Sequence, residues 1–140
     1  MQNILGLGLI LLLAGCGAGA GKGGADPLAG TAWTLDDLAG QGLPAGVAVT
    51  ARFHEGRIGG TAGCNQYFAS YEVRGDSLRV GPAGATKMMC PEPQMAVESA
   101  FLAALGGVKT YKLADGRLQL QADGDRVLDF AAAPFEAPGE

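Results

Sequence analysis

Short runs of alternating apolar and polar residues, separated by turns that contain glycine, recur throughout residues 31–131. The pattern is clearest in Val47–Phe53, Arg117–Gln121 and Arg126–Phe130. Successive side chains of a β-strand point to opposite faces, so this spacing predicts strands that are buried on one face only. Asp115-Gly116 suits the positive φ angles of a tight hairpin turn. The chain is therefore expected to form an antiparallel sheet.

The sequence predicts about eight antiparallel strands. A sheet of this size is expected to be strongly bent or to form a small open barrel, because either arrangement reduces the number of exposed strand edges. The expected strands lie near residues 31–37, 47–53, 57–63, 67–73, 77–80, 84–89, 108–113 and 117–131, the last region being a hairpin.

One segment breaks the alternation. After Pro91-Glu92-Pro93, apolar side chains recur at the helical spacing of Val97, Phe101 and Leu105, and Gly106-Gly107 then ends the pattern. Glu92 and Glu98 lie in or near the N-terminal half of such a helix, where they suit its dipole. We expect one α-helix at about 93–105, packed by its apolar stripe against the sheet, in a mainly β (α+β) fold.

The first residues are typical of an export signal. Ile4–Ala14 is an apolar block of eleven residues, which suits a signal-peptide core and is short for a membrane-spanning helix. It runs into Leu13-Ala14-Gly15-Cys16, which resembles the bacterial lipobox, although Met1–Asn3 lacks the usual positive charge. We expect 1–15 to be a lipoprotein signal peptide and Cys16 to carry the lipid. The alternative is a buried N-terminal helix that ends in a packed cysteine.

A tether and one domain are expected to follow the lipidated cysteine. Residues 16–30 are rich in glycine and alanine and read as a flexible linker, residues 31–131 as the domain, and residues 132–140 as a loose tail. Residue 17 is glycine rather than aspartate, which by the usual sorting pattern predicts anchoring in the bacterial outer membrane, on its periplasmic face.

Charge argues against one class of partner. The chain of 140 residues has 10 Lys and Arg against 14 Asp and Glu, a net charge of −4, and no basic run. Nucleic-acid binding rests on neutralising phosphates with Lys and Arg, so no nucleic-acid partner is expected. The expected partners are the membrane and an envelope protein, the expected oligomeric state is a monomer, and no cofactor or metal is expected.

Two cysteines remain once Cys16 is assigned to lipid. An even number in an exported domain predicts a disulfide, here Cys64–Cys90. Closing this loop would add about 3–4 kcal/mol of stability in the chain-entropy model. Free buried thiols, or a catalytic or metal-binding thiol, are the alternatives. His54, the single histidine, cannot complete a zinc site with two cysteines.

The residues around these cysteines carry a family resemblance. Ile58–Tyr71 contains the order glycine, cysteine, asparagine, and Ala85–Pro93 contains a threonine, a basic residue, two methionines and a cysteine. Both segments are similar to signatures of the META domain family, and within it to the HslJ-like heat-shock lipoproteins. The resemblance implies a compact β-rich envelope domain associated with heat shock, novobiocin resistance, secretion or motility, and it implies no catalytic site.

The motif residues have two interpretations. The structural one assigns Gly63 to a close backbone approach, Asn65 to hydrogen bonds within its own turn, Thr86 to a bridge between strands, and Met88 and Met89 to core gaps. The other is a ligand or partner surface. That surface would be formed by Asn65, Gln66, Tyr67 and Lys87.

The sequence favours a binding role. We expect a non-enzymatic lipoprotein that supports envelope integrity or stress and antibiotic tolerance by binding an envelope component. The alternative is a carrier of lipids or small molecules with a barrel pocket lined by Phe53, Phe101 and Leu118. An enzyme is disfavoured because Glu55 would lie on the strand face opposite His54 and form no dyad with it.

Overall fold

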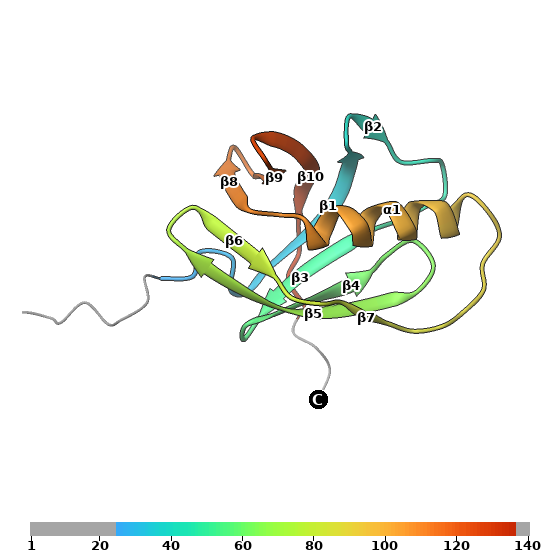
Figure 1. Ribbon diagram of the computed structural model, residues 1–140, viewed down its shortest axis with the longest axis horizontal. Coiled ribbons are helices and arrows are strands. Elements are labelled where there is room, and N and C mark those ends of the chain that lie inside the picture. Colours follow the sequence, from blue (N-terminus) through green and yellow to red (C-terminus); the bar gives the residue numbers. More distant parts are fainter. Residues whose placement is uncertain (1–24, 137–140) are drawn as a thin grey trace, which may run out of the picture.

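Backbone pairing divides the chain into ten strands and one helix over residues 25–136, the part that this computed structural model describes (Figure 1). The elements are β1 (Thr31–Leu38), β2 (Gln41–Gly42), β3 (Thr50–His54), β4 (Arg57–Thr61), β5 (Gln66–Arg74), β6 (Ser77–Val80), β7 (Gly84–Ala85), α1 (Gln94–Gly106), β8 (Thr110–Ala114), β9 (Arg117–Ala122) and β10 (Asp125–Ala133). The prediction of a mainly β fold with one helix is confirmed.

Eight of the strands close into a barrel. Their order is β1-β3-β4-β5-β6-β8-β9-β10, and β10 pairs back with β1 from Ala32↔Ala133 to Leu38↔Leu128. Every pairing is antiparallel, and the junction of β6 with β8 is the narrowest, with one paired position, Ser77↔Thr110. The two-residue strands β2 and β7 lie beside β1 and β5, outside the ring. Closure goes beyond the open barrel that was expected, and it leaves the strands of the ring with few free edges.

Two strands are shorter than expected. The segment expected near 84–89 pairs with β5 only through Gly84–Ala85, because the backbone of Met88 forms hydrogen bonds with the Asn65 side chain instead. The segment expected near 47–53 begins as a strand at Thr50, with an isolated bridge before it at Val49.

The helix α1 crosses the front of the barrel in Figure 1 and lies one residue later than the predicted 93–105. Its stripe of Val97, Phe101 and Leu105 is buried as expected. Phe101 packs edge-on against Tyr67 of β5, with 5.1 Å between the ring centroids. The helix therefore covers the inward-facing residues of the strands, as its periodicity predicts.

One hydrophobic core fills the barrel. Phe53, Phe101 and Leu118, which the carrier hypothesis placed around a cavity, are fully buried members of this core. Phe53 also packs edge-on against Tyr71 at 4.9 Å between centroids. The three side chains pack within the core, so they do not line the internal ligand pocket that the carrier hypothesis expected.

Both domain boundaries extend beyond the predicted 31–131. Leu28, which was expected in the tether, is fully buried, and the Tyr71 hydroxyl donates a 2.5 Å hydrogen bond to Asp26. At the other end β10 continues to Ala133 instead of giving way to a tail at 132. Burial of the apolar Leu28 explains the N-terminal extension, and pairing of β10 with β1 explains the C-terminal one.

The predicted signal peptide and the predicted lipidation site, Cys16, lie outside the described residues. Within residues 25–136, α1 is too short to span a bilayer, so no transmembrane helix is found in that part of the chain.

Candidate functional site

Asn65 is the centre of the motif cluster, which we define as Asn65, Thr86, Met88, Glu98 and the disulfide. The residue is 2% exposed, and its side chain forms four hydrogen bonds. The amide nitrogen donates to Glu98 Oε2 at 2.9 Å and to the Met88 carbonyl at 3.1 Å. The amide oxygen accepts from the Met88 N–H at 2.6 Å and from the Thr86 hydroxyl at 2.9 Å. The Asn65 side chain therefore hydrogen-bonds the backbone of Met88, in another segment, instead of the backbone of its own turn as predicted.

Glu98 is the member of this cluster whose role the sequence did not reveal. It was expected to complement the helix dipole, yet it is 7% exposed and its Oε1 accepts the backbone N–H of Asn65 at 2.5 Å. Within residues 25–136 it has no ion-pair partner, so hydrogen bonds from Asn65 stabilise its carboxylate. A signal existed, since Glu98 directly follows Val97 beside the apolar stripe.

The cysteines close the same cluster. Cys64 and Cys90 form the predicted disulfide, with 5.9 Å between their Cα atoms. Gly63 precedes it with φ at +110°, and a Cβ there would lie 3.1 Å from the Gln94 carbonyl oxygen of α1. The loop between β4 and β5 thus contacts the helix so closely that glycine is required, as the structural interpretation of Gly63 expected.

The methionines do not pack in the core. Met88 is 55% and Met89 is 89% exposed, so the prediction that they fill core gaps is wrong. Hydrogen bonding to Asn65 fixes the Met88 backbone and directs its side chain outward. The expected binding surface is not formed as one unit. Asn65 and Tyr67 are buried, whereas Gln66 and Lys87 are exposed.

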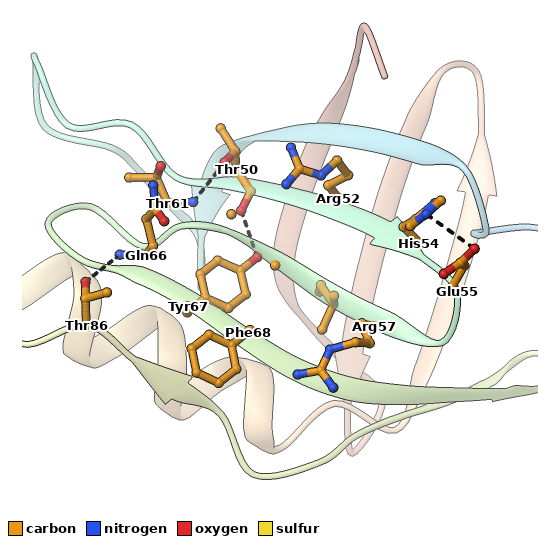
Figure 2. Close-up of a pocket in the computed structure, with 13 residues that line it drawn as sticks. Thr50, Arg52, His54, Glu55, Arg57, Thr61, Gln66, Tyr67, Phe68 and Thr86 are labelled. Atoms are coloured by element: carbon orange, nitrogen blue, oxygen red, sulfur yellow. Dashed lines mark hydrogen bonds and ion pairs between the residues drawn. The ribbon is translucent and has the colours of Figure 1, made fainter. Parts of the chain in front are cut away.

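A pocket of about 500 Å³ lies on the outer face of β3, β4 and β5 (Figure 2). His54 and Glu55 lie at one end of it, and Thr61, Gln66 and Thr86 at the other. Glycine at 59 and 60 leaves the middle of β4 without side chains. A Cβ on Gly60 would lie 2.4 Å from the Thr50 carbonyl oxygen, so strand packing excludes any larger residue there.

Tyr67 links the motif cluster to this pocket. It lies in β5 two residues after Asn65, and its hydroxyl donates a 2.7 Å hydrogen bond to the Thr50 carbonyl. Burial raises the pKa of Tyr67 well above its ordinary value, and the nearby charge of Arg52 opposes that rise in pKa only in part. The hydroxyl therefore stays protonated and holds β5 to β3 across the base of the pocket.

The positive charge of the pocket comes from Arg52 and Arg57. Across residues 25–136, neither guanidinium has an ion-pair or hydrogen-bond partner, whereas four other basic side chains are ion-paired with carboxylates. Arg57 instead lies over the Phe68 ring, 6.0 Å from its centroid. The paired side chains are Arg74, Lys109, Arg117 and Arg126.

His54 and Glu55 are closer than the sequence predicted. Their side chains approach to 3.7 Å between Nε2 and Oε1, because β3 ends at His54 and Glu55 takes a positive φ of +48° in the following turn. The prediction that these two side chains lie on opposite faces assumed that the strand continues to Glu55, but β3 ends at His54. In the described part of the chain no group of three or more His, Cys, Asp or Glu side chains is placed to hold a metal ion.

A comparison with known protein families finds a match that covers most of the chain. The family model of the META domain matches residues 26–134. The chain belongs to the META domain family. The match begins at Asp26, in agreement with the packing of Leu28 and Asp26 against the barrel, and it includes both signature segments.

Solved structures share the fold of this META domain. A protein from Burkholderia xenovorans, solved by NMR, is 27% identical with a TM-score of 0.65, over 76% of this chain and 83% of its own. A second NMR structure is 20% identical with a TM-score of 0.61, over 74% and 90%. A crystal structure of a DUF4847 family protein from Bacteroides vulgatus is 15% identical with a TM-score of 0.54, over 75% and 94%. A search of curated proteins finds no match.

Proposed function

We propose that this META domain is a non-catalytic envelope lipoprotein, similar to the HslJ-like proteins, that supports envelope integrity or stress and antibiotic tolerance by binding an envelope component. The observation that carries the proposal is the pocket on β3, β4 and β5, where two guanidinium groups that have no ion-pair partner within residues 25–136 face outward. Unpaired cations in a concave site are available to a partner, whereas ion-paired ones are already satisfied.

The motif cluster supports this assignment by fixing the pocket. Asn65, through Glu98 and Met88, holds the start of β5, and Tyr67 in that strand holds Thr50 of β3. Positioning of this kind reduces the entropy lost when a partner binds. The proposal places the protein as a monomer at the periplasmic face of the bacterial outer membrane, anchored through lipid on Cys16 and without a cofactor.

The carrier alternative is not favoured. It required an apolar space lined by Phe53, Phe101 and Leu118, and all three are fully buried among other core side chains. A ligand between them would have to displace packed residues, which costs several kcal/mol. The outer pocket, by contrast, requires no rearrangement of the core.

Affinity capture from native membranes tests the proposed function, with the tagged full chain as bait. The charge variant R52Q/R57Q is compared with R79Q/K112Q, which removes the same charge from two exposed residues that are also unpaired within residues 25–136. A partner that wild type and R79Q/K112Q capture, and R52Q/R57Q loses, supports the proposal. A partner retained equally by both variants would contradict the placement of the site.

Intact mass spectrometry of the same bait tests the anchor. The proposal expects the mass of a chain that begins at Cys16 with its acyl chains, and a loss of two hydrogens for the Cys64–Cys90 disulfide. An unmodified Cys16 would contradict the proposed localisation.

A further inference from the structure

We infer that the pocket on β3, β4 and β5 binds an oxyanion, a carboxylate or phosphate group, carried on a compact body with an apolar or planar face. The inference rests on the proposed function and deepens it by naming the chemistry of the ligand. Arginine suits such a group because its planar guanidinium donates two parallel hydrogen bonds to carboxylate or phosphate oxygens.

Strand register places the recognising side chains around one gap. Arg52 of β3 is paired with Gly59 of β4, and Gly59 is paired in turn with Phe68 of β5. Side chains on paired positions project from the same face of the sheet, so Arg52 and Phe68 stand on either side of a residue without a side chain. Arg57, two positions from Gly59 in the same strand, closes a third side (Figure 2).

Charge selects an anion for this gap. The lining holds two arginines and one carboxylate, Glu55, and that carboxylate lies against His54 at the end of the pocket. The whole chain carries a net charge of −4, so this local excess of positive charge is not a general property of the protein. A half-buried position such as that of Arg52 also lowers the local dielectric constant, which strengthens its attraction for an anion.

Phe68 supplies the second recognition element. Phe68 is 51% exposed, because it points outward from β5 and leaves part of its apolar surface in water. The neighbouring Arg57 covers part of it by a cation–π contact. A ligand with a planar or apolar face beside its oxyanion would cover the remaining surface while the oxyanion binds the guanidinium groups. The pocket, of about 500 Å³, has room for a ligand of small-molecule size.

Calorimetric titration tests this chemistry, on the full chain in a non-ionic detergent. The probes are phenyl phosphate, benzoate and inorganic phosphate, with benzyl alcohol as the neutral control. We expect phenyl phosphate and benzoate to bind, and to bind more weakly as ionic strength rises. We expect R52Q/R57Q to weaken both about tenfold or more, and R79Q/K112Q to leave both unchanged. Equal binding of benzyl alcohol, or equal behaviour of the two variants, would overturn the inference.

Replacing the ring separates the two recognition elements. We expect Phe68→Ala to weaken phenyl phosphate severalfold and to leave inorganic phosphate unchanged, whereas Leu113→Ala, at another exposed apolar residue, should affect neither. An unchanged affinity of the Phe68 variant for phenyl phosphate would overturn the role of the ring.

Vesicles identify the source of the oxyanion. Stronger binding to phosphatidylglycerol vesicles than to phosphatidylcholine vesicles, lost in R52Q/R57Q, would assign a lipid headgroup, and binding of the soluble probes alone would assign a small acid. If capture from membranes depends on the arginines but no oxyanion probe binds, the ligand class is wrong and the proposed function stands. If the probes bind through the arginines but no partner is captured, the ligand class stands and the proposed function is wrong.

Discussion

The carboxylate of Glu98 accepts both the backbone N–H and the side-chain amide of Asn65, at 2.5 Å and 2.9 Å. These two residues lie 33 positions apart, one at the entry to β5 and one in the second turn of α1. The contact joins the helix to the strand at a buried point, where unpaired polar groups are costly. It explains why a charged residue is tolerated beside the apolar stripe of the helix.

Removing this carboxylate should destabilise the fold. Glu98→Ala leaves the N–H and the amide of Asn65 without these acceptors, and we expect the free energy of unfolding to fall by about 2–4 kcal/mol. Urea denaturation measures the change. Glu72→Ala is the control, because Glu72 is exposed and its ion pair with Arg74 contributes little. If the two variants were equally stable, the proposed importance of the contact would be refuted.

Opening the disulfide should also cost stability. The Cys64–Cys90 bond spans 26 residues, and we expect the C64S/C90S variant to lose about 3–4 kcal/mol relative to the oxidised protein. Thermal unfolding with and without a reducing agent measures the same difference in wild type. The reducing agent should leave the melting temperature of C64S/C90S unchanged, and a shift in that variant would mean that the reagent acts elsewhere.

A methyl group at residue 60 should disturb the pocket. Gly60→Ala places a Cβ within 2.4 Å of the Thr50 carbonyl oxygen, so β3 or β4 must move, and we expect a loss of about 1–3 kcal/mol. Gly106→Ala at the end of α1 meets no atom within 4 Å and should be neutral or stabilise by up to about 1 kcal/mol. Denaturant midpoints decide the matter, and a neutral Gly60→Ala would show that the two strands are not held at this distance.

Alkaline pH should unfold the protein through its tyrosines. Burial raises the pKa of Tyr67, and burial with a hydrogen bond to Asp26 raises that of Tyr71. A group whose pKa is higher in the folded state contributes stability that is complete below its unfolded pKa, about 10, and that is lost as pH rises above it.

Stability should therefore fall above about pH 10, by up to about 1.4 kcal/mol per pH unit for the deeply buried Tyr67 and by less for Tyr71, whose charge solvent screens in part. Phenolate absorbance and circular dichroism, followed together, measure ionisation and unfolding. We expect Tyr67 to ionise only as the fold is lost, and Tyr67→Phe to show a shallower decline. Ionisation of all three tyrosines near pH 10 with the fold intact would contradict this prediction.

The sequence was informative where local pattern determines structure. Alternation located most strands, and the spacing of Val97, Phe101 and Leu105 located α1 to within one residue. It failed where a distant side chain replaced a local pairing. The strand expected near 84–89 is interrupted because Asn65, more than twenty residues earlier, bonds to the backbone of Met88. No periodicity within the segment itself carries that information.

The candidate pocket shows the same limit. The motifs identified Thr86, Gln66 and Tyr67. The sequence pattern did not distinguish Arg52 and Arg57, because each is an ordinary charged residue in a predicted strand. Their importance arises from register, which sets Arg52 beside Gly59 and Phe68, and from the lack of an ion-pair partner for either guanidinium within residues 25–136.

By itself, the sequence determined the mainly β fold with one helix, the disulfide and the META domain family, because each depends on residue types at short or fixed spacings. Tertiary structure decided that the sheet closes through β1 and β10, that Glu98 is buried against Asn65, and that two arginines without an ion-pair partner among the described residues share one pocket. Each of these depends on the distance between atoms from remote segments, and only packing of the whole chain sets such distances.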